Sequence, residues 1–138
     1  GLEPSRLKLE ITESVVMAVE DAFSLLDRLR KIGISLALDD FGTGYSSLSY
    51  LKMLPVQQLK IDRSFVIGIG TNPEDEAIIR SVMALAQSLD FEVVAEGVET
   101  AEQAAFLSAW GCHQLQGFLH GSAVAPAEFR ARWASLPR

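Results

Sequence analysis

Short runs of alternating apolar and polar residues recur along the chain and are separated by stretches with helical periodicity. The alternating runs predict five strands, over residues 7–12, 34–39, 57–62, 92–96 and 114–116. Strands that alternate with helices in this way are expected to be parallel and joined by right-handed crossovers. The pattern therefore predicts an α/β fold of five successive strand-helix units.

Helices are predicted from the spacing of apolar residues between the strands. Residues 19–32 and 73–89 have this spacing, and a short helix is expected over residues 47–53. In the first two helices the apolar stripe comprises Ala22, Leu25, Leu26 and Leu29, then Ile78, Val82, Leu85 and Leu89.

Capping signals mark where several of these helices begin and end. Gly33 ends the first helix, and Asn72 followed by Pro73 begins the long one. Thr100 with Gln103 forms a capping box for a helix that runs to Gly111, and a last helix follows Pro126.

Each predicted strand has one apolar face and one polar face. The polar positions are Lys8, Glu10, Thr12, Ser35, Asp39, Gln58, Lys60, Asp62, Glu92, Glu96, Gln114 and Gln116. A doubly wound sheet carries helices on both sides and would need two apolar faces, whereas the inside of a barrel accepts polar groups. We therefore favour a (β/α)8 TIM-type barrel, with the doubly wound sheet as the alternative.

The length of the chain makes that barrel a partial one. A complete (β/α)8 barrel takes about 250 residues, and the chain has 138. We expect residues 1–138 to form the C-terminal portion of a domain that extends roughly 110 residues, or three strands, upstream.

Composition narrows the possible partners. The net charge of −6 argues against a protein that binds DNA or RNA through a basic surface. No apolar run reaches the roughly 20 residues of a transmembrane helix, so a cytoplasmic domain is expected, although the parent protein could be anchored in a membrane. A single cysteine, Cys112, with two scattered histidines gives neither a disulfide nor a zinc spacing.

Acidic side chains gather where the predicted strands end. Glu10, Asp39, Lys60, Glu96 and Gln116 lie at or near the C-terminal ends of their strands, where barrel enzymes place catalytic groups, and Asp40 follows directly. Converging carboxylates repel one another unless cations neutralise them, and hard divalent ions prefer such oxygens. The alternative is that these acids cap strands and pair with Lys8 and Lys60.

Five motifs also carry a family resemblance. In chain order they are LEITES (9–14), LDDFGTGYSSL (38–48), LKIDRSF (59–65), AEGVET (95–100) and QGF (116–118). Their order and spacing resemble the EAL-domain cyclic di-GMP phosphodiesterases of bacteria. The resemblance implies a (β/α)8-type barrel that hydrolyses cyclic di-GMP to linear pGpG with two Mg²⁺ or Mn²⁺ ions.

The same resemblance implies a role for each acidic residue. Glu10, Asp39 and Glu96 would ligate metal, Asp40 would serve the second ion, and Lys60 would orient or deprotonate the nucleophilic water.

Further residues match the family outside the metal ligands. Glu13 resembles the glutamate that anchors the loop over residues 40–47, and Asp62, Glu99 and Gln116 resemble further site residues. The resemblance also implies a homodimer and, in the parent protein, fusion to sensory or cyclase domains.

The chain also departs from the family pattern. The strands that supply the glutamate of the Glu-Ala-Leu motif and a ligand asparagine lie upstream of Gly1, and the loop GFLHGSAVAP (117–126) and His113 differ from the usual residues. A catalytically inactive cyclic di-GMP receptor is therefore the alternative function. The DFG sequence at 40–42 does not indicate a kinase, because no VAIK-like lysine, HRD loop or glycine-rich nucleotide loop accompanies it.

Overall fold

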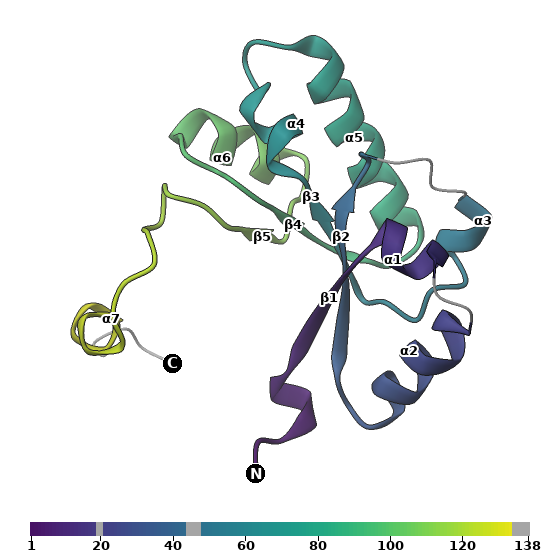
Figure 1. Cartoon of the computed structure of the whole chain (residues 1–138). Coiled ribbons are helices and arrows are strands. Elements are labelled where there is room, and N and C mark those ends of the chain that lie inside the picture. The colour runs from purple at the N-terminus through teal and green to yellow at the C-terminus, as the bar shows by residue number, and fades with distance from the viewer. Residues whose placement is uncertain (19–20, 44–47, 134–138) are drawn as a thin grey trace.

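Five parallel strands form one sheet in the computed structural model, which describes residues 1–18, 21–43 and 48–133. The strands are β1 (Lys8–Thr12), β2 (Ser35–Phe41), β3 (Gln58–Ile61), β4 (Glu92–Ala95) and β5 (Gln114–Leu115). Their order in the sheet is β1-β2-β3-β4-β5, and every neighbouring pair is parallel (Figure 1). A doubly wound sheet reverses its strand order at a switch point, and no reversal occurs here. The arrangement is that of a partial (β/α)8-type barrel.

Helices connect successive strands. The helical elements are η1 (Pro4–Arg6), α1 (Glu13–Ala18), α2 (Ala22–Lys31), α3 (Leu48–Leu51), α4 (Arg63–Ile67), α5 (Pro73–Ser88), α6 (Ala101–Ala109) and α7 (Pro126–Trp133). The predicted caps are confirmed: the Asn72 side chain accepts a hydrogen bond from the Glu74 N–H group, and Thr100 with Gln103 forms the capping box. Gly33 has a φ of 99°, which favours glycine and ends α2.

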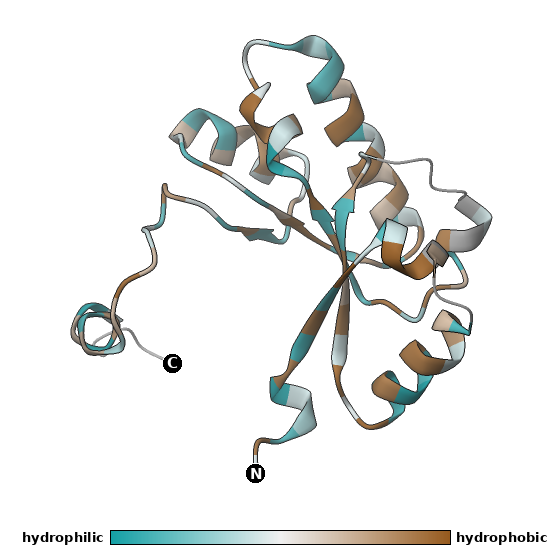
Figure 2. Cartoon of the chain, in the orientation of Figure 1, coloured by the Kyte–Doolittle hydropathy of each residue, from teal (hydrophilic) through white to brown (hydrophobic). Residues whose placement is uncertain are grey.

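The core lies between the sheet and the helices that cover its apolar face. Leu36, Leu38, Leu59, Ile61 and Val93 are fully buried there. The other face of the sheet carries the polar residues, so hydrophobic and hydrophilic colours alternate along β1 (Figure 2). The predicted parity of the strands is therefore confirmed.

Two helix predictions need correction. The helix predicted over residues 19–32 is α2, which covers only Ala22–Lys31, because Asp21 has a φ of 62° and begins α2 from a left-handed conformation. The separate helix α1 (Glu13–Ala18) precedes it and was not predicted, and residues 19–20 lie outside the described part. Leu25, expected on the buried stripe, is 50% exposed.

The buried face of α5 is also rotated from the predicted stripe. Ile79, Val82, Met83 and Ala86 face the core, and Ile78, Leu85 and Leu89 are only partly buried. The stripe predicted over Ile78, Val82, Leu85 and Leu89 lies on one side of the helix, whereas α5 contacts α4 as well as β3 and β4.

The chain after β5 extends away from the sheet to α7 (Figure 1). Every residue of α7 is exposed, including Phe129 and Trp133. Among the described residues, no helix combines the length and the hydrophobicity that crossing a bilayer requires.

Candidate metal centre and active site

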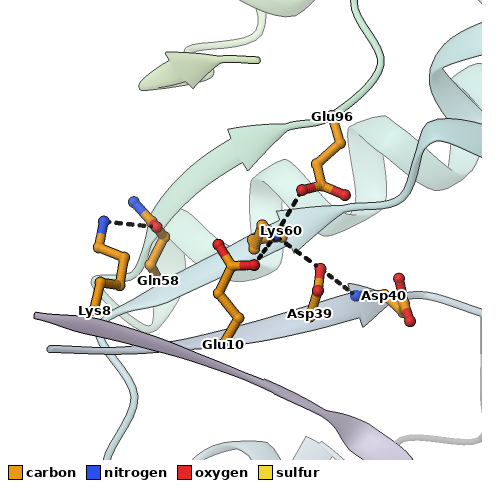
Figure 3. Close-up of polar contacts among 7 residues, drawn as sticks. All are labelled: Lys8, Glu10, Asp39, Asp40, Gln58, Lys60 and Glu96. Atoms are coloured by element: carbon orange, nitrogen blue, oxygen red, sulfur yellow. Dashed lines mark hydrogen bonds and ion pairs between the residues drawn. The ribbon is translucent and has the colours of Figure 1, made fainter. Parts of the chain in front are cut away.

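Three carboxylates meet one lysine on the polar face of the sheet. Glu10 comes from β1, Asp39 from β2 and Lys60 from β3, and Glu96 follows the last residue of β4. Because the strands are parallel and in register, these side chains lie in neighbouring rows of the same face. Figure 3 shows the three carboxylates pointing toward the end of Lys60.

Lys60 contacts all three acids at once. Its Nζ atom lies 2.6 Å from Glu10 Oε2, 2.6 Å from Glu96 Oε1 and 3.2 Å from Asp39 Oδ1. The Lys60 side chain is only 4% exposed, whereas those of Glu10, Asp39 and Glu96 are 47%, 22% and 21% exposed. The lysine is therefore the buried floor of the cluster, and the acids are reached from solvent.

The charges of the cluster determine the ionisation of Lys60. Burial by itself lowers the pKa of Lys60, but hydrogen bonds to Glu10, Glu96 and Asp39 outweigh burial and raise that pKa above its ordinary value. The ammonium group is thus stabilised by its neighbours. Three carboxylates against one ammonium still leave the cluster negative, so it attracts a further cation.

The donor set fits a divalent ion. One ligand oxygen each from Glu10, Asp39 and Glu96 lie within 4.8 Å of one another, and this is the group of potential metal ligands found among the described residues. Carboxylate oxygens on three separate elements suit Mg²⁺, Mn²⁺ or Ca²⁺ better than a softer metal. Asp40, also predicted as a ligand, lies beside this group but does not belong to it.

A β-bulge explains how two consecutive aspartates share this end of the sheet. Leu38 pairs with Leu59 and Phe41 with Ile61, so β2 has one more residue than β3 between these pairs. Asp40 has a φ of 55°, and Phe41 returns to the core with 4% exposure. Without the bulge, strict alternation would direct Asp40 into the apolar layer. Asp40 is exposed, but incomplete hydration of its carboxylate, followed by the charges of Asp39 and Asp62, raises the pKa of Asp40.

Asp62 and Glu13 are placed at helix starts. Asp62 caps α4, and its carboxylate accepts hydrogen bonds from the N–H and hydroxyl groups of Ser64, which lower the pKa of Asp62. Glu13 begins α1, and its Oε2 atom is buried without a hydrogen-bond partner among the described residues. The loop that Glu13 was predicted to anchor includes residues 44–47, which lie outside the described part.

Glu99 and Gln116 lie at the ends of β4 and β5, beyond the metal cluster. They line an open pocket of about 210 Å³ together with Arg63, Gly97, Gly117 and Phe118. Arg63 was not predicted as a site residue, although its position directly after Asp62 at a strand end is the signal that points to it. Lys8 donates a hydrogen bond to Gln58 Oε1 at 2.9 Å and forms no ion pair with the acids in the part of the chain that the structure describes.

A model of the EAL domain family matches residues 1–123. The chain belongs to the EAL domain family. It is 50% identical over 129 residues to the bifunctional diguanylate cyclase/cyclic di-GMP phosphodiesterase MucR of Pseudomonas aeruginosa. The matching region covers 93% of this chain and 19% of MucR. Its identity to the cyclic di-GMP phosphodiesterase NbdA of the same organism is 49% over 120 residues, covering 86% of this chain and 15% of NbdA.

Solved EAL structures have the same fold. The MucR phosphodiesterase in complex with c-di-GMP superposes with a TM-score of 0.88 at 46% identity, over 93% of this chain and 52% of that one. Klebsiella pneumoniae BlrP1 in a manganese/cy-diGMP complex has a TM-score of 0.77 at 40% identity, over 86% of this chain and 30% of BlrP1. The family resemblance and the barrel fold predicted from the five motifs are confirmed, and the chain spans less than a fifth of the two curated relatives.

Proposed function

We propose that this chain forms the acidic, metal-binding part of a phosphodiesterase site that hydrolyses cyclic di-GMP to linear pGpG. The observation that carries the proposal is the convergence of Glu10, Asp39 and Glu96 on Lys60 at the C-terminal ends of parallel strands. The names of MucR and NbdA, and the c-di-GMP present in the MucR structure, support the choice of substrate.

Glu10, Asp39 and Glu96 would hold a divalent cation, with Asp40 serving a second. Mg²⁺ or Mn²⁺ is proposed, and the manganese and calcium complexes of BlrP1 support a divalent ion. Bound ions of this kind lower the pKa of water and neutralise charge on a phosphodiester.

Lys60 would position the reacting groups from beneath. Its ammonium group offers three N–H donors and is fixed by the acids around it. Because all three donors are directed at the acids, one of them would become available to a water molecule or a phosphate oxygen when a bound cation takes over a carboxylate. Its burial also keeps bulk water away from the floor of the site.

The remaining site residues are proposed to act around this centre. Glu13 would anchor the loop over residues 40–47, since its buried Oε2 atom lacks a partner among the residues described. Glu99 and Gln116 would contact the substrate from the pocket at the ends of β4 and β5. A cytoplasmic location, a homodimer and fusion to cyclase or sensory domains remain predictions, and the bifunctional name of MucR supports the fusion.

An assay of cyclic di-GMP turnover tests the proposal. The intact protein is incubated with Mn²⁺ and cyclic di-GMP, and linear pGpG is quantified by chromatography. Asp39→Asn and Glu96→Gln should each lower turnover by roughly 100-fold or more, because outer partners of metal sites already cost about 10- to 100-fold.

Asp27→Asn is the matched control for these variants. Asp27 also forms two ion pairs, with Arg30 and with Lys31, but it lies on α2 away from the cluster. Its variant should keep full turnover. Folded Asp39→Asn and Glu96→Gln proteins with turnover like that of Asp27→Asn would refute the phosphodiesterase proposal, and binding of cyclic di-GMP without any turnover by the wild type would favour the receptor alternative.

A further inference from the structure

A second row of polar side chains lies on the same face of the sheet, on the N-terminal side of the metal cluster. Its members, which we call the lower layer, are Lys8, Gln58, Glu92 and Gln114. Each of them stands two or four positions before a residue of the candidate site, so it shares the polar face with that residue. Figure 3 shows Lys8 and Gln58 beside the cluster.

Gln58 joins the lower layer into one chain of hydrogen bonds. Its Oε1 atom accepts a hydrogen bond from Lys8 Nζ at 2.9 Å, and its Nε2 atom donates one to Glu92 Oε2 at 3.3 Å. The same oxygen of Glu92 accepts a hydrogen bond from Gln114 Nε2 at 3.5 Å. Lysine can only donate and an ionised carboxylate can only accept, whereas an amide does both. Gln58, which is 3% exposed, therefore connects β1 to β4.

The separation of β1 and β4 matters to the metal cluster. These strands are three spacings of about 4.8 Å apart, which is roughly 14 Å along a flat sheet. Glu10 on β1 and Glu96 after β4 nevertheless offer ligand oxygens that lie within 4.8 Å of each other. How closely these two acids approach thus depends on the curvature of the sheet, and a link between β1 and β4 fixes that curvature.

A small residue on β2 makes room for this link. The Lys8–Gln58 and Glu10–Lys60 contacts both run from β1 to β3 and pass over β2. Ala37 of β2 is in register with Glu10 on one side and with Gln58 on the other, and it is fully buried. A larger side chain at this position would stand between β1 and β3. The two contacts are therefore parallel links, one in the cluster and one beneath it.

We propose that Gln58 is a positioning residue that holds β1 and β4 at the separation at which Glu10 and Glu96 bind one cation. This inference rests on the metal centre of the proposed function. A bound cation would compete with Lys60 for the acids and so weaken the link within the cluster. The hydrogen bonds of Gln58 go to Lys8 and Glu92, which are not in the group of potential metal ligands, so the lower layer links the strands with and without the ion.

The affinity for Mn²⁺ measures this role without any turnover. The intact protein is titrated with Mn²⁺ by isothermal calorimetry in the absence of substrate. Gln58→Met nearly preserves the length of the side chain and its lack of charge, and it removes both hydrogen bonds. Loss of an outer partner that contacts a ligand directly lowers metal affinity about 10- to 100-fold. Because Gln58 acts through the strands, we expect a smaller loss of about 3- to 10-fold.

The neighbouring glutamine is the matched control. The Gln57 amide also makes two hydrogen bonds, accepting one from the Leu36 N–H group at 2.9 Å and donating one to the carbonyl oxygen of Pro55 at 3.1 Å. These bonds lie outside the lower layer. Gln57→Met should therefore keep the Mn²⁺ affinity of the wild type, and urea denaturation of both variants shows how much stability each has lost.

Two variants at Glu92 separate the hydrogen bond from the charge. Glu92→Gln and Glu92→Met both remove one negative charge from an exposed residue, but only Glu92→Gln keeps an oxygen that accepts from Gln58. Glu92→Met should bind Mn²⁺ more weakly than Glu92→Gln, again by about 3- to 10-fold, whereas an effect of charge alone predicts equal affinities. This comparison stands even if Gln58→Met does not fold.

The outcomes distinguish the two proposals. Equal Mn²⁺ affinities in Gln58→Met and Gln57→Met, or in the two Glu92 variants, would overturn the positioning role and leave the proposed function intact. Mn²⁺ binding by a wild type that does not hydrolyse cyclic di-GMP would overturn the proposed function alone. A wild type that binds no Mn²⁺ would overturn both.

Discussion

Replacing Lys60 by methionine perturbs the centre of the site with little change in side-chain length. The ammonium group has three carboxylate partners and its side chain is 4% exposed. Removing one member of a buried ion pair typically costs about 3–5 kcal/mol, because the partner charge is left uncompensated. Here the acids are partly solvated, so we expect a loss near the lower end, about 3 kcal/mol in the free energy of unfolding without metal.

A surface ion pair of the same length provides the control. Lys31 Nζ lies 2.6 Å from Asp27 Oδ2, but its side chain is 70% exposed. Lys31→Met should therefore cost only about 0–1 kcal/mol. Urea denaturation of the intact protein with a chelator present measures both losses. Adding Mn²⁺ should reduce the difference in unfolding free energy between wild type and Lys60→Met, since a bound cation replaces the missing positive charge among the acids.

The raised pKa of Lys60 also predicts how the difference in unfolding free energy between wild type and Lys60→Met depends on pH. A group whose folded pKa is raised contributes its stability fully below its unfolded pKa, about 10.4 for lysine, and loses it as the pH rises through the folded pKa. The difference in unfolding free energy should therefore be constant between about pH 7 and pH 10 and should decrease only at higher pH. A Lys60→Met loss no larger than that of Lys31→Met, or one unaffected by Mn²⁺, would refute the reasoning.

Three further changes test other parts of the structure. Asp62→Ala should cost about 1 kcal/mol of unfolding free energy as a lost helix cap. Because the pKa of Asp62 is lowered, this contribution is lost as the pH falls through the folded pKa, and an equal loss at neutral pH and at about pH 2 would contradict it. Gly117→Ala should cost about 1–3 kcal/mol in the same assay, because its Cβ would meet the Val98 backbone, and unchanged stability would argue against that contact. Partial burial raises the pKa of the Cys112 thiol, so iodoacetamide should modify it more slowly at neutral pH than it modifies glutathione; equal rates would count against this raised pKa.

The sequence allowed the polar face of the sheet to be predicted because alternation along a strand is a local property. Glu10, Asp39 and Lys60 fall on one face by counting in twos, and the structure brings them into contact. That Lys60 reaches three acids at once depends on the register between four elements, which no single segment specifies. For the same reason the sequence did not indicate that Arg63 and Glu99, 36 positions apart, form an ion pair.

The elements that the sequence missed depend on tertiary contacts. The bulge at Asp40 is defined only by the pairing of β2 with β3, and it extends β2 to Phe41, two residues beyond the predicted strand. The short helix α4 contains five residues and contacts α5, so packing rather than its own length stabilises it. Capping motifs, by contrast, act within one segment, and those at Asn72 and Thr100 were predicted correctly.

The position of a bound metal tests the central claim most directly. Crystals of the intact protein soaked in Mn²⁺ would be measured at the manganese absorption edge, where anomalous density locates the ion independently of any activity. We predict a peak between the carboxylates of Glu10, Asp39 and Glu96 that is lost in Asp39→Asn and kept in Asp27→Asn. No peak at the three carboxylates, or a peak there that survives Asp39→Asn at full height, would contradict the assignment of this cluster as the metal centre.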